Sequence, residues 1–339
     1  MGAAVIPTVV YVTVGVALLF DVINGFHDAA NSIATIVSTR VLSPRLAVLW
    51  ATVFNFVALF IFKVGVASTI EKIIKIQPGD NAFVWIVICG LFGAIVWNML
   101  TWWWGLPSSS THALVGGMSG AGLAYGGFSV LVKANLYKTL YFIILAPVLG
   151  LILGALFMFL IYWLFRRMRP RRIDKIFRSG QLLSAAAYSI GHGGNDAQKT
   201  IGVIWAVMVA GGVMDEKSTG VPTWVIFASY GAMAFGTLIG GRRIIKTMGM
   251  GITSLKPVGG FCANLAGAVT LFGATAYHIP VSTTHTITGA IVGVGSVAKF
   301  RGIRWGLATR IVWAWIFTIP AAGLVGAATL LIAQALHAW

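Results

Sequence analysis

The chain has 339 residues, of which 58% are hydrophobic and 9% charged, and its mean hydropathy is +0.90. This composition excludes a water-soluble globular domain and is typical of a polytopic α-helical membrane protein. The formal net charge of +16 comes mostly from lysines and arginines in short loops between apolar runs, which is how membrane topology is set. We therefore expect the lipid bilayer, and no nucleic acid, as a partner.

Ten apolar runs follow one another along the chain. They span residues 5–38, 46–69, 82–105, 107–128, 140–165, 181–212, 223–241, 257–277, 281–298 and 305–336. A helix of about 20 apolar residues crosses the hydrocarbon core of a bilayer. Because the first and last runs exceed that length, the pattern predicts an all-α fold with about 10 to 12 membrane segments.

A basic segment divides the ten runs into two sets of five. Residues 166–178 contain seven arginines and lysines and only one acidic residue, Asp174, and such loops stay in the cytoplasm. We expect two membrane repeats, 1–165 and 181–339, joined by a cytoplasmic linker, 166–180. With five segments each, the halves would lie antiparallel, as in transporters built from inverted repeats with broken helices or hairpins meeting at a central site.

The charges of the other loops agree with this topology. Together with the basic segment, the loops 40–45, 242–256 and 299–304 hold 16 of the 24 lysines and arginines, and the loops 70–81, 129–139 and 213–222 hold five. The first set is expected in the cytoplasm and the second outside.

Polar residues interrupt the first and the sixth apolar run in a related pattern. The first contains His27-Asp28-x-x-Asn31, and the sixth contains Asn195-Asp196-x-x-Lys199, with Asp196 placed 168 positions after Asp28. Ionisable groups at membrane depth are costly and usually serve a function. The two segments, called the acidic motifs below, therefore mark a duplicated functional site.

A second pair of motifs begins the fourth and ninth runs. Pro107-Ser-Ser-Ser-Thr-His112 is matched, 173 positions later, by Pro280-Val-Ser-Thr-Thr-His285. Proline followed by hydroxyls is typical of a helix start, whose free N–H groups and partial positive charge bind oxyanions. We expect these hydroxyl motifs to form an anion site; alternatively, their hydroxyls only cap helices or bond to carbonyl groups.

The carboxylates of Asp28 and Asp196 would repel an oxyanion, so a bound cation or proton is expected beside them. Asparagine side chains and unwound backbone carbonyls in interrupted helices would complete such a site. Asp21 lies seven residues before Asp28, on the same helical face, and has no acidic counterpart at Ser189. The alternative is a permanent pair between Asp196 and Lys199, three residues apart.

The histidines suit hydrogen-bond donation to an anion or proton carriage. They show no close ligand spacing within one helix, so no structural metal site is expected. Serine, histidine and aspartate also permit an integral-membrane hydrolase or phosphatase, but no Gly-x-Ser-x-Gly elbow is present and a catalytic site is seldom duplicated. We expect neither enzymatic activity nor a cofactor.

Two overlapping sets of residues are thus expected to form the site. The substrate-binding set is Asn24, His27, Asn31, Ser109, Ser110, Thr111, His112, Asn195, Lys199, Ser282, Thr283, Thr284 and His285. The cation-coupling set is Asp21, Asp28, Asn31 and Asp196.

The four motifs, in this order, resemble those of the inorganic phosphate transporter family (PiT), and the resemblance covers essentially the whole chain. It implies cation-coupled phosphate import through the inner membrane of a bacterium, and it implies a homodimer. The His27-Asp28 form resembles short bacterial members, which implies coupling to protons and transport of metal–phosphate complexes. Sodium as the coupling cation, and a sulfate permease of the same family, stay open as alternatives.

Overall fold

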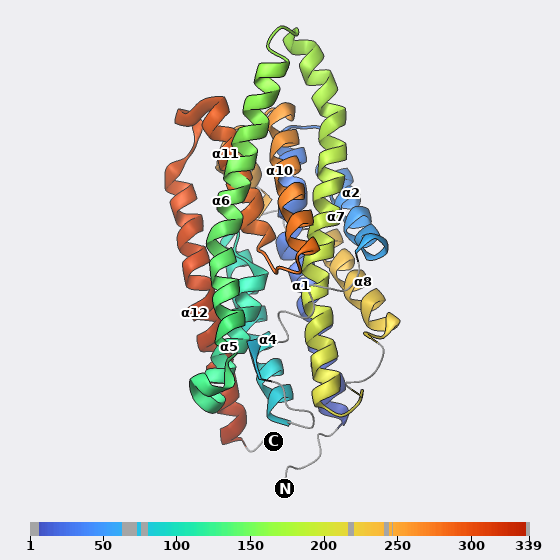
Figure 1. Cartoon of the computed structure of the whole chain (residues 1–339), viewed down its shortest axis with the longest axis vertical. Coiled ribbons are helices and arrows are strands. Elements are labelled where there is room, and N and C mark those ends of the chain that lie inside the picture. Colours follow the sequence, from blue (N-terminus) through green and yellow to red (C-terminus); the bar gives the residue numbers. More distant parts are fainter. Residues whose placement is uncertain are drawn as a thin grey trace.

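The computed structural model describes residues 7–62, 73–75, 81–215, 220–240, 244–245 and 247–336. Parts of the loops 70–81, 213–222 and 242–256 lie outside these residues. The described chain contains ten helices of 17 residues or more (Figure 1): α1 (Pro7–Ser38), α2 (Pro44–Ile61), α4 (Asn81–Trp104), α5 (Ser110–Gly126), α6 (Lys133–Leu164), α7 (Pro170–Ala210), α8 (Thr223–Ile239), α10 (Pro257–Ala276), α11 (Thr283–Lys299) and α12 (Trp305–Ala335). Each overlaps one of the ten apolar runs, so the all-α prediction is confirmed.

Six of the described helices are long and apolar enough to cross a membrane, namely α1, α2, α4, α6, α10 and α12. Large apolar side chains on the outer helices are exposed, such as Ile144 on α6 (71%) and Leu324 on α12 (73%). Side chains of this kind are stable facing lipid and unfavourable in water. The protein is therefore a multi-pass membrane protein, and the count of 10 to 12 segments stays a prediction.

Both acidic motifs lie inside continuous helices, which corrects the expectation of unwound backbone at these positions. The helices α1 and α7 run through the motifs without a break. Glycines two residues before each motif serve close packing instead: a Cβ on Gly25 would strike the Met233 carbonyl of α8, and one on Gly193 would strike the Asn55 carbonyl of α2. The breaks lie at the hydroxyl motifs, where the chain turns between α4 and α5 and between α10 and α11.

The basic segment is also mostly helical. Only residues 165–169 separate α6 from α7, so residues 170–180 of the predicted linker belong to a helix. Pro170 occupies the first turn of α7, where its missing N–H costs nothing, and Phe177 packs against Phe165 and Phe261. The α6–α7 hairpin projects at the top of Figure 1, beyond the remaining helices.

Helices of one half pack mainly on helices of the other. The contacts come in matched pairs, since α1 packs on α8 and α7 on α2, while α5 packs on α12 and α11 on α6. Glycines allow the close approach in the second pair: a Cβ on Gly120 would strike the Gly323 carbonyl, and one on Gly293 would strike the Leu151 carbonyl. This packing brings the starts of α5 and α11 together between α1 and α7.

Candidate functional site

The hydroxyl motifs begin two helices, as predicted. Ser109 precedes α5 and accepts a hydrogen bond from the His112 N–H (3.3 Å), and Ser282 precedes α11 and accepts one from the His285 N–H (3.2 Å). Capping therefore accounts for these two serines. The ring centroids of His112 and His285 are 4.5 Å apart, so the two helix starts meet.

Asp196 lies where the two starts meet. Its Oδ1 accepts a hydrogen bond from Lys199 Nζ at 2.6 Å, and its Oδ2 accepts one from the Thr283 hydroxyl at 3.2 Å and lies 3.3 Å from His192 Nε2. All four side chains are buried. The predicted contact between Asp196 and Lys199 is thus present in the structure, and a hydroxyl and an imidazole accompany it.

Lys199 also connects both hydroxyl motifs. In addition to Asp196, its ammonium group donates to the Thr111 hydroxyl at 2.6 Å and to the Val281 carbonyl at 2.9 Å. An ammonium group has three N–H donors, and here each has an acceptor. The side chain therefore holds an acidic motif against the start of α5 and the segment before α11.

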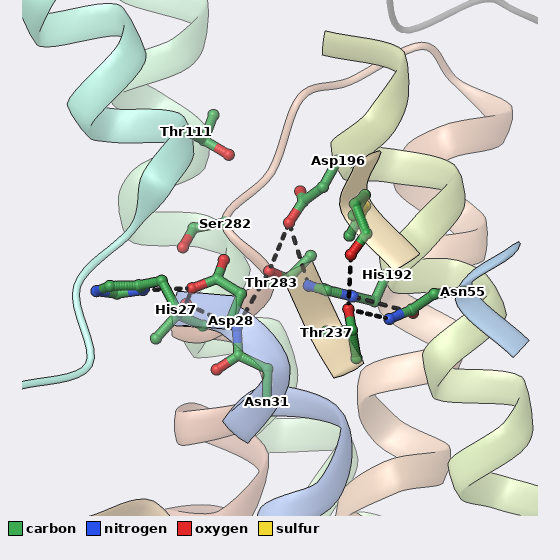
Figure 2. Close-up of polar contacts among 12 residues, drawn as sticks. His27, Asp28, Asn31, Asn55, Thr111, His192, Asp196, Thr237, Ser282 and Thr283 are labelled. Carbon is green, nitrogen blue, oxygen red and sulfur yellow. Dashed lines mark hydrogen bonds and ion pairs between the residues drawn. The ribbon is translucent and has the colours of Figure 1, made fainter. Parts of the chain in front are cut away.

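Asp28 approaches the same place from α1. Its Oδ1 lies 2.8 Å from His27 Nδ1 and 3.5 Å from the Thr284 hydroxyl. Asn31, one turn further along α1, donates to the hydroxyls of Thr284 (2.9 Å) and Thr283 (3.4 Å). The first residues of α11 thus stand between the two carboxylates, as Figure 2 shows for Thr283.

One cluster could hold a cation. The ligand atoms of Asp28, His192 and Asp196 all lie within 4.8 Å of one another, and the three side chains are buried. Two carboxylates and an imidazole are acceptable donors for a small cation. Asp28 comes from α1, and His192 and Asp196 come from α7, so the spacing of histidines within one helix does not predict this cluster.

Three polar residues that contact the site histidines were not among the predicted site residues. His27 Nε2 lies 3.1 Å from the Thr101 hydroxyl and 3.4 Å from that of Ser108, while His192 Nδ1 lies 3.1 Å from the Asn55 side-chain oxygen. The only available signal was that Thr101 and Asn55 are isolated polar residues within apolar runs. Neither belongs to a repeated motif.

Some buried polar atoms of the predicted site residues have no hydrogen-bond partner among the described residues. They include Ser110 Oγ and His112 Nδ1, at the start of α5, and Asn24 Oδ1. A buried polar group without a partner is costly unless a ligand or water pairs with it. His285 Nε2 also has no partner among the described residues, and the His285 ring stacks at 3.8 Å on Trp315, whose indole N–H donates to the Pro107 carbonyl at 3.2 Å.

Two predicted site residues have their partners elsewhere. Asn195 donates to the Thr275 hydroxyl and the Ile279 carbonyl, both at 3.4 Å, beside the end of α10. Asp21 is bonded to Thr200 and not to any member of the central cluster. Its seven-residue spacing from Asp28 places it about 10 Å along α1.

Comparison with known proteins gives consistent results. Residues 24–326 match the Phosphate transporter family. A protein of Rhizobium meliloti (strain 1021), named probable low-affinity inorganic phosphate transporter, is 52% identical over 314 residues, which cover 93% of each chain. A protein of Bacillus subtilis (strain 168) with the same name is 43% identical over 92% of this chain and 93% of its own.

A solved structure described as the sodium-dependent phosphate transporter superposes with a TM-score of 0.88 over 97% of this chain and 99% of its own. At 24% identity it shows the fold alone. The family match, in contrast, includes all four motifs, and it sets aside the hydrolase alternative. The chain belongs to the Phosphate transporter family.

Proposed function

We propose that this protein imports inorganic phosphate together with protons across the bacterial plasma membrane, with phosphate bound between the starts of α5 and α11. The observation that carries the proposal is the convergence of both helix starts on one buried cluster with Lys199, Asp28 and Asp196. Family membership supports phosphate as the substrate.

The anion would be held by donors of three kinds. The first turns of α5 and α11 offer backbone N–H groups and aligned dipoles, Ser110 offers a hydroxyl that no described residue pairs with, and Lys199 offers an ammonium group. When phosphate binds, the hydrogen bond that Lys199 donates to Thr111 would be replaced by one that Lys199 donates to phosphate. The hydroxyls of Thr283 and Thr284 would complete the site from the side of α11.

Protons fit the described geometry because each carboxylate has an imidazole beside it. The His27–Asp28 distance is 2.8 Å and the His192–Asp196 distance is 3.3 Å. A proton on either pair would offset the negative charge that otherwise repels phosphate. The continuous backbone of α1 and α7 offers no unwound carbonyls, which many sodium sites in transporters use.

Sodium is the second candidate. It is favoured by the Asp28, His192 and Asp196 cluster, and the solved structure with the same fold is described as sodium-dependent. If sodium is the coupling ion, these three residues would hold it. Transport of phosphate as a metal complex, and assembly as a homodimer, stay predictions.

We further propose that the two halves are inverted repeats with the α6–α7 hairpin in the cytoplasm. The matched packing of α1 on α8 with α7 on α2, and of α5 on α12 with α11 on α6, supports this arrangement. The excess of arginine in the hairpin supports its orientation. A site between antiparallel halves could then open to either side of the membrane in turn.

The test is uptake of labelled phosphate into proteoliposomes with a proton gradient or a sodium gradient imposed separately. Proton coupling predicts accumulation with the proton gradient alone and proton entry during uptake. Accumulation only with sodium would replace protons by sodium in the proposal. Accumulation of labelled sulfate but not of labelled phosphate would contradict phosphate as the substrate.

A further inference from the structure

Asp21 is a buried carboxyl group that the proposed mechanism does not use. Its side chain has no exposed surface, and its Oδ1 accepts a hydrogen bond from the Thr200 hydroxyl of α7 at 2.6 Å. None of the ion pairs found among the described residues includes Asp21. An ionised carboxylate in such a place would be very costly.

Two buried atoms beside it lack partners. Asp21 Oδ2 and the Ser229 hydroxyl, which faces the carboxyl group from α8, make no hydrogen bond of 3.5 Å or less among the described residues. The Ser229 hydroxyl can donate to an ionised Oδ2 or accept from a protonated one. Only the protonated acid, whose O–H would donate to Ser229 while Oδ1 continued to accept from Thr200, pairs these atoms without leaving a buried charge.

A sodium ion fits this place less well. Its ligands would have to be side-chain oxygens, since α1, α7 and α8 are continuous here and their carbonyl groups are engaged in helix hydrogen bonds. The helices also pack closely at the next residue of α1, because a Cβ on Gly236 of α8 would strike the Val22 carbonyl. The titratable groups that face Asp21 are Tyr230 from α8 and Asp196 from α7, and neither supplies a positive charge.

The location is distinct from the central cluster. Asp21 precedes Asp28 on α1, and Thr200 follows Asp196 on α7, so both partners lie on the side of the cluster away from the α6–α7 hairpin. The corresponding position in the other half, Ser189, is not acidic. An acidic residue at the position of Asp21 is therefore present in the first half only.

We propose that Asp21, together with Thr200 and Ser229, is a second proton-binding site whose proton is released and taken up during transport. This inference rests on the proposed proton-coupled function and adds a proton outside the central cluster. The site lies between that cluster and the face of the protein opposite the basic hairpin. Protons that cross with phosphate would then include one carried by Asp21.

The decisive variant is Asp21→Asn in the full-length protein, because an amide has the shape and hydrogen bonding of a neutral acid. Phosphate binding and exchange of phosphate for phosphate should persist. Accumulation driven by a proton gradient should be lost, and proton entry per phosphate should fall by about one. The matched control is Ser189→Ala, which should keep gradient-driven accumulation.

An infrared difference spectrum between wild type and Asp21→Asn gives a readout that does not depend on transport. A protonated carboxylic acid band that disappears in the variant is expected. Wild-type accumulation by Asp21→Asn would overturn the inference, as would an absent acid band together with thermal protection by sodium of the wild type but not of the variant.

If Asp21→Asn does not fold, Thr200→Val provides the test, because it removes the donor to Oδ1 and keeps the side-chain shape. Its uptake should show a shifted pH profile with phosphate exchange retained, and an unchanged profile would count against the site. Failure of the wild type to bind phosphate would overturn the proposed function instead, while the infrared band would still report on Asp21.

Discussion

The ammonium nitrogen of Lys199 lies 2.6 Å from Asp196 Oδ1 and 2.6 Å from the Thr111 hydroxyl, so one side chain joins the second acidic motif to the first hydroxyl motif. Asp28 has no such partner, since its neighbour is the imidazole of His27. The two carboxylates thus occupy similar positions in their motifs, but only Asp196 is paired with a buried lysine.

This difference predicts unequal effects of the same substitution. Asp196→Asn leaves the Lys199 charge buried among neutral groups and should reduce the free energy of unfolding by about 3 to 5 kcal/mol. Asp28→Asn should cost much less, because it leaves no lysine or arginine charge buried without its partner. Both variants should lose concentrative uptake, and thermal unfolding in detergent alongside uptake would show this. Equal stability losses would refute the structural part of the prediction, and normal gradient-driven uptake in both would remove the carboxylates from the mechanism.

Ser109 and Ser110 are adjacent hydroxyls for which we predict opposite outcomes. Ser109 caps α5, so Ser109→Ala should lower the free energy of unfolding by about 0.5 to 2 kcal/mol and leave phosphate affinity unchanged. Ser110 Oγ has no partner among the described residues, so Ser110→Ala should keep stability and weaken phosphate binding by about 1 to 3 kcal/mol. Calorimetric titration and thermal unfolding of the purified variants separate the two. Unchanged affinity in Ser110→Ala would mean that the anion binds elsewhere.

Gly120 tests the packing that brings the helix starts together. An added Cβ would strike the Gly323 carbonyl of α12, so Gly120→Ala should force α5 away and destabilise the protein by about 1 to 3 kcal/mol. Gly15→Ala on α1 is the control, since nothing lies within 4 Å of its Cβ position. It should be neutral or slightly stabilising, because alanine favours a helix. Equal melting temperatures of the two variants would contradict the packing described for α5.

The orientation of the halves can be tested with single cysteines. Arg171→Cys in the hairpin and Lys133→Cys at the start of α6 both place a thiol at an exposed position, and the charge distribution assigns them to opposite sides of the membrane. A membrane-impermeant thiol reagent added to intact cells should label only Lys133→Cys. The native Cys89 and Cys262 are buried, so background labelling should be low. Labelling of Arg171→Cys from outside would reverse the assignment.

The sequence by itself determined the helices and the residue types of the site. Runs of apolar residues, prolines followed by hydroxyls, and the duplicated motifs are local signals, because hydrophobic length and capping depend on residues close together in the chain. The Asp196–Lys199 contact is also predicted by a local signal, since a spacing of three residues puts both side chains on one helix face.

Only the tertiary structure decided which of these residues meet. The backbone of α1 and α7 stays helical at the acidic motifs, and the glycines beside the motifs let neighbouring helices approach. From one sequence, this use of glycine cannot be told from a helix break. The contribution of His192 to the central cluster, and the separation of Asp21 from it, follow from contacts among α1, α7 and α8. Such contacts join residues far apart in the chain, and no local pattern records them.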